Sequence, residues 1–299
     1  MIEGAKILRT KLKENPILKI AGAFDAMSAK LVELNNFDAV WAGSFAISAT
    51  HALPDASILT MTEFLSAASS MTDACSIPII ADCDTGFGGP SNVSHLVKKY
   101  ENAGIAAICI EDKIFPKQNS LLKDGKQELL SEKDFVAKII AGKTAKNNPN
   151  FMIIARIEAL IAGHGIEEAL KRATAYEIAG ADAILIHSKK NTPDEVFEFC
   201  NTWNGNIPII VIPTTYPTVT LDELKNNNVK MVIYANQSLR AAHWAMSEHL
   251  NQLSNVKSLS EVKTNLTSME DIFHLQEMYE IKKQESDIEK NLKKLGYIN

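Results

Sequence analysis

The apolar run IAAICI, residues 105–110, is followed at once by the segment EDKIFPKQNS, residues 111–120. Apolar residues in an unbroken row are typical of a parallel β-strand that is covered on both faces. The segment after it carries two acids, two lysines, an asparagine and a serine, whereas a turn selected only for folding more often contains Gly, Pro, Asn and Asp. This junction therefore predicts a buried strand that leads into a loop with a chemical role.

Seven further apolar runs of the same kind recur along the chain. Amphipathic stretches such as PSNVSHLVKKYENAG and GIEEALKRATAYEIAG separate them, and each of these two ends in a Gly that is typical of a helix C-cap. Eight strand-then-helix units in roughly 250 residues predict an α/β fold of the TIM type, a (β/α)8 barrel, with a doubly wound open sheet as the alternative. The further runs are residues 17–23, 37–43, 77–83, 151–158, 181–187, 207–213 and 229–235.

The composition indicates a soluble globular protein. The chain has 299 residues, 46% of them apolar and 22% charged, which is enough for a large core. The net charge of −5 gives no reason to expect a nucleic acid or a membrane surface as partner. No apolar run reaches the roughly 18 residues of a transmembrane helix, and the four cysteines lack metal-ligand spacing. Reduced thiols and a charged amphipathic amino terminus favour a cytoplasmic location.

The charged helical residues after the last strand exceed what a barrel requires. We expect residues 1–255 to form the barrel with an amino-terminal helix, and residues 256–299 to form a helical extension. Two interpretations of this extension are open. It is exposed to solvent, or it packs on the barrel or on another subunit.

Carboxylates gather at the predicted strand ends, where the functional residues of such barrels lie. In the motif ADCD, Asp82 and Asp84 are two residues apart, so both side chains would project to the same side of a strand. Glu111 ends the neighbouring strand. Carboxylates held close together repel unless a cation lies between them, and oxygen ligands suit Mg²⁺. The residues predict a magnesium site; the alternative is that the aspartates only cap the strand or the next helix.

Arg156 and His187 end the next two strands and form a cationic half of the site. Arginine offers a planar fork of donors for phosphate or carboxylate oxygens, and histidine adds a donor or a proton. Together with a metal, they would suit a small substrate with several negative charges. The alternative is that Arg156 pairs with Glu158 or Glu111 only to neutralise buried charge.

Six long motifs together resemble the phosphoenolpyruvate mutase family of the isocitrate lyase superfamily, over residues 17–280. They are WAGSFAISATHALPDASILTM, ADCDTGFGGPSNV, EDKIFPKQNS, ARIEALIAGHGIEEALKRA, DAILIHSKK and VIPTTYPT. The resemblance implies a barrel with a terminal helix swapped between subunits, in dimers that pair into tetramers. It also implies transfer of the phosphoryl group of phosphoenolpyruvate from oxygen to carbon, giving 3-phosphonopyruvate. A decarboxylase or transaminase would then consume that product, because the equilibrium of the family's reaction favours phosphoenolpyruvate.

The resemblance also implies a role for individual residues. Asp82 would bind Mg²⁺, with Mn²⁺ as a second possibility, and Asp84 and Glu111 would bind it through water. The segment KIFPKQNS would be a gating loop that closes over the substrate and excludes water, because water would divert the metaphosphate-like species to phosphate. The implied catalytic residues are Asp55, Lys117, Asn119, Arg156 and His187, and the implied substrate-binding residues are Trp41, Gly43, Ser44, Phe45 and Ser120.

Two departures from the family pattern concern the substrate. The family reads Trp-x-Ser-Gly where this chain has Trp41-Ala42-Gly43-Ser44, so the serine and the glycine are transposed. We expect the amides of Ser44 and Phe45 to anchor the substrate, with Ser44 offering a displaced hydroxyl. The second departure is His164 in AGHG, where AGWG is usual; it would lie either at the rim of the site or at a helix start.

Three other functions remain open at this point. Phosphonopyruvate hydrolases share most of these motifs but typically carry Thr at the position of Asn119, which favours the mutase. The same alternative includes an enzyme that acts on a related phosphono- or carboxy-substituted pyruvate. A C–C lyase of 2-hydroxy acids would need a loop cysteine, and no cysteine lies between residues 110 and 199. A binding or scaffold protein is disfavoured by the intact set of acids, which would destabilise the rim without a metal or a substrate.

Overall fold

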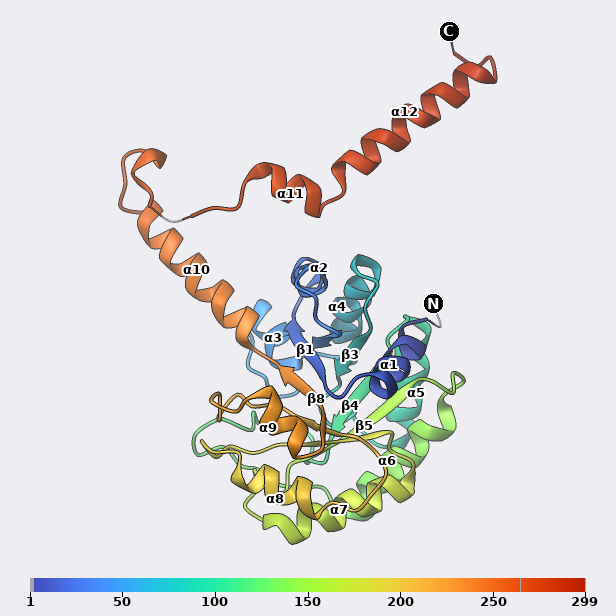
Figure 1. The fold of residues 1–299 in the computed structure, drawn as a ribbon, viewed down its shortest axis with the longest axis vertical. Coiled ribbons are helices and arrows are strands. Elements are labelled where there is room, and N and C mark those ends of the chain that lie inside the picture. The colour runs from blue at the N-terminus through green and yellow to red at the C-terminus, as the bar shows by residue number, and fades with distance from the viewer. Residues whose placement is uncertain (1–2, 264, 299) are drawn as a thin grey trace. The chain divides into compact units, whose positions relative to one another are not determined.

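The eight predicted strands form a closed, all-parallel barrel in sequential order, β1 to β8 (Figure 1). The computed structural model describes residues 3–263 and 265–298. Each predicted apolar run contains one strand, which confirms the (β/α)8 barrel and excludes the open sheet. The strands are β1 Leu18–Ala23, β2 Ala39–Ala42, β3 Ile79–Asp82, β4 Ala107–Glu111, β5 Met152–Ile157, β6 Ala183–Ile186, β7 Ile209–Val211 and β8 Val229–Tyr234.

The helices between the strands, from α2 to α9, surround the barrel (Figure 1). Local sequence signals set their ends. Thr60 forms a capping box with Glu63 at the start of α4, and Gly180 ends α7 with its backbone in the left-handed region, at φ 101°. The helices are α1 Glu3–Glu14, α2 Ala26–Leu34, α3 Ser44–Thr50, α4 Met61–Ala74, α5 Pro90–Asn102, α6 Glu132–Ala145, α7 Gly165–Ala179, α8 Asp194–Thr202, α9 Leu221–Asn226 and α10 Gln237–Leu253.

Alternate residues of each strand belong to two separate buried clusters. In β4, Ile108 and Ile110 pack with helix residues, whereas Ala107 and Cys109 pack with residues of the other strands and of α1. The second set therefore points into the barrel. Two residues beyond Cys109 on the same side comes Glu111, so strand periodicity alone directs this carboxylate into the mouth of the barrel.

Helix α1 lies at the amino-terminal ends of the strands. Its Ala5 and Leu8 belong to the interior cluster, and Arg9 donates to the carbonyl of Asn150 and to the carboxylate of Asp182, just before β5 and β6. Since α1 occupies that end, the opposite, carboxyl-terminal end is where a ligand can enter.

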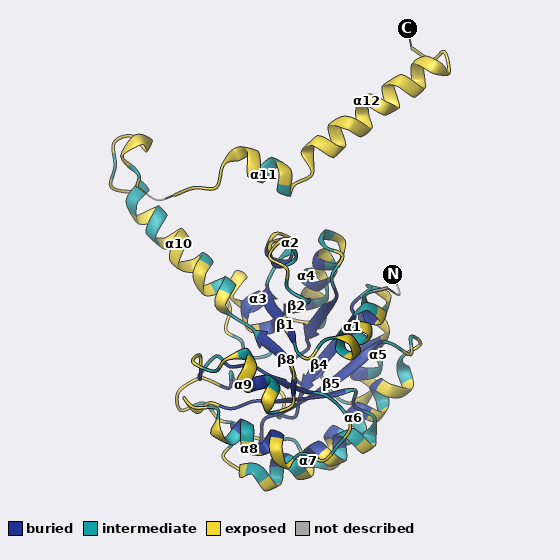
Figure 2. Cartoon of the chain, viewed as in Figure 1, coloured by how far each residue is buried: buried dark blue, intermediate teal, exposed yellow. Residues whose placement is uncertain are grey.

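The chain divides into two compact units, residues 1–241 and residues 242–299, and the division falls inside α10. The second unit contains a 3₁₀ turn at Leu259–Glu261 and the helices α11 Met269–Leu275 and α12 Met278–Lys294. None of the described residues of α10, α11 and α12 is buried, and apolar side chains such as Trp244 and Leu295 are exposed (Figure 2). Packing of this extension on the barrel or on another subunit stays a prediction.

Candidate active site

A cavity of about 500 Å³ opens among residues that follow the carboxyl ends of the strands. Strand β2 leads to its Trp41–Ala46 wall, and later strands lead to Asp82, Arg156 and His187. Residues 117–122 of the loop after β4 also line the cavity, as does Asp55 from the segment between α3 and α4. Of the residues expected to bind substrate or catalyse, all ten line this cavity: Trp41, Gly43, Ser44, Phe45, Asp55, Lys117, Asn119, Ser120, Arg156 and His187.

The expected metal ligands lie at the ends of β3 and β4. Strand β3 ends at Asp82, and Asp84 lies beyond it with φ 50°, so the expectation that both belong to one strand is wrong for Asp84. The backbone amide of Asp84 donates to Oδ1 of Asp82 (3.2 Å), which keeps the two carboxylates together. Both carboxylate oxygens of Glu111 are buried without a hydrogen bond among the described residues, whereas Asp84 Oδ1 lies 2.8 Å from the ammonium of Lys117.

The charges around the cavity do not balance. Three cations, those of Lys113, Lys117 and Arg156, face a larger number of buried carboxylates, those of Asp55, Asp82, Asp84, Glu111 and Glu158. The surplus of two negative charges equals the charge of one divalent cation. Within the described chain, no three acidic, histidine or cysteine side chains converge closely enough to chelate an ion directly. A hydrated Mg²⁺, which keeps several waters, fits such a set better than a fully chelated ion.

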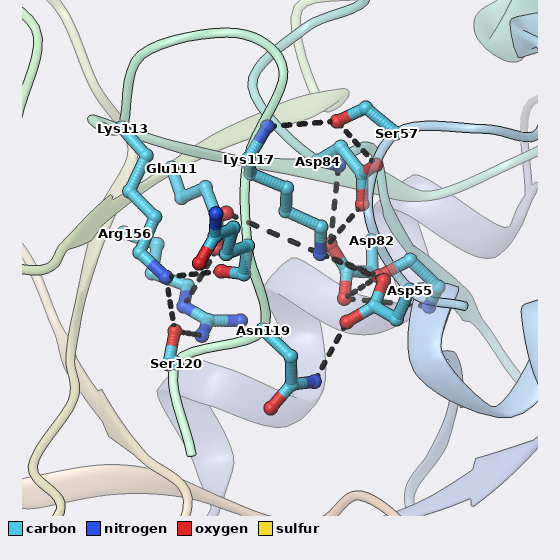
Figure 3. Close-up of polar contacts among 12 residues, drawn as sticks. Asp55, Ser57, Asp82, Asp84, Glu111, Lys113, Lys117, Asn119, Ser120 and Arg156 are labelled. Carbon is cyan, nitrogen blue, oxygen red and sulfur yellow. Dashed lines mark hydrogen bonds and ion pairs between the residues drawn. The ribbon is translucent and has the colours of Figure 1, made fainter. Parts of the chain in front are cut away.

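Lys117 reaches from the loop into this set of carboxylates. Its ammonium lies 2.8 Å from Asp84 Oδ1 and 3.0 Å from Asp55 Oδ1, and it donates to the hydroxyl of Ser44 (3.2 Å). Burial favours the neutral amine, but the carboxylates outweigh it and raise the pKa of Lys117 well above its ordinary value. The Lys117 side chain is therefore a positive charge held between Asp55 and the expected metal ligand Asp84 (Figure 3).

Asn119 is held rigidly above the cavity. Its Nδ2 donates to Asp55 Oδ2 (2.7 Å), and its Oδ1 accepts from the backbone amide of Leu121 (3.0 Å). Burial raises the pKa of Asp55, but the charge of Lys117 and the hydrogen bond from Asn119 outweigh this and lower it. Asp55 is thus an ionised acceptor that fixes the tip of the loop.

Arg156 and His187 share Glu158 as their partner. Arg156 Nε pairs with Glu158 and lies 3.4 Å from Glu111 Oε2, so the charge-neutralising pairing considered for Arg156 does occur. Its Nη1, however, forms no hydrogen bond within the described residues, and the side chain lines the cavity. Burial, reinforced by the charge of Arg156, lowers the pKa of His187, so the imidazole is neutral at pH 7.

The transposed residues after β2 have a steric explanation. Trp41 is buried, and a Cβ atom on Gly43 would lie 2.9 Å from the indole Nε1. A serine at position 43 would therefore collide with Trp41. Ser44 instead directs its hydroxyl to Asp82 Oδ2 (2.9 Å), and its backbone amide also points to this oxygen (3.3 Å). The Ser44 amide, which was expected to anchor the substrate, thus also donates to Asp82, an expected metal ligand.

The loop after β4 leaves and re-enters the barrel at one point. The amide of Ile114 donates to the carbonyl of Glu128 (3.0 Å), and the amide of Leu130 donates to the carbonyl of Asp112 (2.8 Å). Lys113 and Leu129 form an antiparallel bridge between these bonds. The loop therefore has a paired neck, and Lys117, Asn119 and Ser120 lie in the part beyond it.

Several residues of this region had no role assigned from the sequence. Thr214, in the motif VIPTTYPT after β7, and Asn236, after β8, also line the cavity, and their place at strand ends was the signal that could have found them. Buried Lys113 gave no signal, because its role depends on how the loop folds back. His164 is exposed at the start of α7 and does not line the cavity.

A family model described as phosphoenolpyruvate phosphomutase matches residues 8–254 of the chain. The chain belongs to this family. As a member of the phosphoenolpyruvate phosphomutase family, it is an enzyme of the phosphoenolpyruvate mutase/isocitrate lyase superfamily, which confirms the resemblance found in the sequence. In the described residues no helix is long and apolar enough to cross a membrane.

Relatives of this family member carry out two different reactions. Phosphonopyruvate hydrolase of Variovorax sp. (strain Pal2) is 43% identical over 90% of this chain and 93% of its own length. Phosphoenolpyruvate phosphomutase of Tetrahymena pyriformis is 42% identical over 92% of each chain. Overall identity therefore does not separate the two reactions.

The similar solved structures also include both a mutase and a hydrolase. Phosphoenolpyruvate phosphomutase from Streptomyces platensis subsp. rosaceus superposes with a TM-score of 0.93 at 45% identity, over 95% of this chain and 99% of that one. Phosphonopyruvate hydrolase in complex with oxalate and Mg²⁺ gives 0.89 at 39% identity, over 95% and 98%. The overall fold therefore does not separate the two enzymes either.

Proposed function

We propose that the protein is a Mg²⁺-dependent phosphoenolpyruvate mutase, which interconverts phosphoenolpyruvate and 3-phosphonopyruvate. The observation that carries this proposal is the contact between Asn119 and Asp55, which places a carboxamide with no reactive proton acceptor at the tip of the loop. An intramolecular transfer needs the departing phosphoryl group to be caged and kept from water, with no strong external nucleophile. Asn119 and Lys117 supply donors and a positive charge without supplying a base for water.

The carboxylates of the metal region fit Mg²⁺. Asp82 would bind the ion directly, and Asp84 and Glu111 would bind it through water. The two Glu111 oxygens that lack a hydrogen bond and the surplus negative charge support this assignment. The ion would stabilise the enolate and carboxylate oxygens of the pyruvate part. A phosphonopyruvate hydrolase of similar fold, solved in complex with oxalate and Mg²⁺, supports the proposal of a divalent ion. Mn²⁺, another ion with oxygen preferences, is the second possibility.

The cations on the opposite side would hold the phosphoryl group. Arg156 offers its free Nη1, and His187 offers a neutral ring nitrogen to phosphoryl oxygens. When the C–O–P bond breaks, the phosphoryl group would be retained between these residues and Asn119 until C3 of the enolate forms the new bond to phosphorus. Trp41 and the backbone after β2 would wall the pyruvate part, with the amide of Phe45 available at the start of α3.

Hydrolysis of phosphonopyruvate is the second candidate, because a hydrolase is as similar to this chain as the mutases are. It would require a water molecule to reach phosphorus inside the closed cavity. Asn119, where the hydrolases typically carry Thr, favours the mutase.

The deciding experiment is ³¹P NMR of the purified protein with phosphonopyruvate and Mg²⁺. We expect a phosphate-ester signal from phosphoenolpyruvate. Formation of inorganic phosphate would replace the mutase by the hydrolase. If the starting signal persists while the protein is folded and binds Mg²⁺ with oxalate, the protein acts on another substrate, and both candidates fail.

The same proposal extends to assembly and pathway. The exposed apolar side chains of α10 and α12 support packing against a second copy, as in a helix-swapped dimer or tetramer, and light scattering on a sizing column would measure the mass. Because the equilibrium of the reaction would favour phosphoenolpyruvate, a decarboxylase or a transaminase would be needed to consume phosphonopyruvate. We expect the protein to act in the cytoplasm.

A further inference from the structure

The loop and the phosphoryl side of the cavity meet at one buried carboxylate, that of Glu158, whose side chain is 0% exposed. Its Oε2 accepts a hydrogen bond from the hydroxyl of Ser120 (2.6 Å) and lies 3.4 Å from the ammonium of Lys113. Its Oε1 pairs with Arg156 Nε and lies 2.9 Å from His187 Nδ1. One oxygen thus faces the loop, and the other faces the residues assigned to the phosphoryl group.

Buried hydrogen bonds hold the backbone of Glu158 in place. Its backbone amide donates to Asp112 Oδ1 (2.9 Å), and the other carboxylate oxygen of Asp112 accepts from Arg172 Nη1 (3.0 Å) and from the hydroxyl of Tyr176 (2.8 Å). Asp112 directly follows β4, and Arg172 and Tyr176 belong to α7; all three are buried. Glu158 cannot follow the loop, so a movement of the loop changes which groups its carboxylate holds.

On the loop side, Lys113 and Ser120 act as one unit (Figure 3). The ammonium of Lys113 donates to Ser120 Oγ (2.6 Å) and to the carbonyl of Gln118 (2.9 Å). Ser120 Oγ also accepts from Arg156 Nη2 (3.1 Å). When the loop is seated, the hydroxyl therefore bridges Arg156, Lys113 and Glu158. Among the described residues, only Arg156 and His187 contact Glu158 Oε1 with a polar side-chain atom.

We propose that Glu158 is a positioning residue that couples the seating of the loop to the orientation of Arg156 and His187. When Ser120 withdraws, Glu158 Oε2 loses its closest donor, and Lys113, the nearest cation to this oxygen at 3.4 Å, moves towards it. Arg156 Nη2 loses its acceptor, Ser120 Oγ, at the same time, so Arg156 turns from the orientation that it has while the loop is seated. The cationic groups are thus aligned for the phosphoryl group only while the loop excludes water, which would protect the transferring group from hydrolysis. This inference rests on the mutase proposed above.

A double-mutant cycle between Ser120→Ala and Glu158→Gln tests the coupling, with kcat and KM for phosphonopyruvate as readouts. Each single variant should lower kcat about tenfold or more, as expected for loss of a hydrogen bond to a charged group. The double variant should be no more than about threefold slower than the slower single variant, because both changes break the same link. Multiplied effects in the double variant would overturn the proposal.

Ser57 provides the matched control. Its hydroxyl also contacts the loop, accepting from the amide of Lys117 (3.2 Å), but it does not touch Glu158. Ser57→Ala combined with Glu158→Gln should therefore give multiplied effects. If this pair is as non-additive as the test pair, the coupling is not specific to Ser120, and the proposal fails.

A second measurement does not depend on turnover or on the folding of Glu158 variants. Amide hydrogen exchange is measured with and without oxalate and Mg²⁺, in the wild type and in Ser120→Ala. This substitution changes one side chain of the loop and leaves Glu158 in place. The ligands should slow exchange both in residues 113–130 and at the ends of β5 and β6, and Ser120→Ala should abolish the effect at the strand ends. Equal protection at the strand ends in both proteins would overturn the proposal.

The two proposals fail in different ways. A wild-type protein that forms no phosphoenolpyruvate but shows this Ser120-dependent protection would overturn the reaction and support the coupling. An active mutase with multiplied mutational effects and Ser120-independent protection would overturn the coupling and leave the reaction intact.

Discussion

The carboxamide nitrogen of Asn119 lies 2.7 Å from Oδ2 of Asp55, although 64 residues separate them in the chain. Asp55 comes from the segment between α3 and α4, and Asn119 comes from the loop after β4. Together with the contacts of Lys117 to Asp55 and Ser57, this hydrogen bond joins the two segments across the cavity, so the tip of the loop has one defined position.

Asn119→Ala tests whether this position of the loop tip serves the chemistry. We expect kcat for the formation of phosphoenolpyruvate to fall at least a hundredfold, because a donor to the transferring group and the anchor of the loop are both lost. The affinity for Mg²⁺ with oxalate, measured by calorimetry, should change less than about threefold, since the metal ligands do not contact Asn119. Unchanged turnover would show that the loop tip takes no part in the reaction.

The close approach of Trp41 to Gly43 predicts that the family's usual order of residues is not tolerated here. Gly43→Ser should destabilise the fold by about 1–3 kcal/mol in urea unfolding, because the new Cβ would overlap the indole ring. Gly89→Ser is the matched control: no atom lies within 4 Å of a Cβ at that position, so its stability should not fall. Equal stabilities of the two variants would contradict the steric explanation.

The buried ion pair between Arg172 and Asp112 supports the end of β4. Arg172→Met should cost about 3–5 kcal/mol of unfolding free energy, because it leaves the Asp112 carboxylate buried without its cation. The neighbouring Lys171, 65% exposed and paired only on the surface, is the control, and Lys171→Met should change stability by less than about 1 kcal/mol. A small effect of Arg172→Met would mean that Tyr176 and the backbone suffice to hold Asp112.

Affinity for Mg²⁺ should depend on pH through Asp84. Burial, against the attraction of Lys117, raises the pKa of this carboxyl to about 6, above the ordinary value of 3.8. The ion binds the ionised form, so affinity should be constant well above pH 6 and fall about tenfold for each unit below it. Calorimetry between pH 5 and pH 8 would measure this. Asp84→Asn should bind more weakly and lose this pH dependence; a flat profile in the wild type would show that Asp84 does not titrate with the ion.

Strand periodicity made much of the site predictable. Glu111, Arg156 and His187 follow interior residues of their strands by two positions, so an apolar run is enough to direct them into the barrel mouth. The family resemblance supplied the loop residues and Asp55. Asp84 shows where periodicity stops, because the strand ends before it and its left-handed backbone is set by the turn.

The contacts of Glu158 were not predictable in the same way. The pairing of Glu158 with Ser120 and Lys113 depends on how a long loop folds back on its own neck, and no periodic pattern encodes this. The displacement of the serine from position 43 likewise depends on one rotamer of Trp41. Both are packing relationships between residues whose types alone suggest other partners.

The paired neck of the loop, from Asp112 to Leu130, makes residues 114–128 a replaceable cassette. Both ends are hydrogen-bonded to each other and anchored at one place on the barrel, so the residues between them can be exchanged or lengthened without disturbing any strand. Relatives of this chain at 42–43% identity include both a mutase and a hydrolase, and a loop anchored in this way allows the outcome of a reaction to change by exchange of these residues alone.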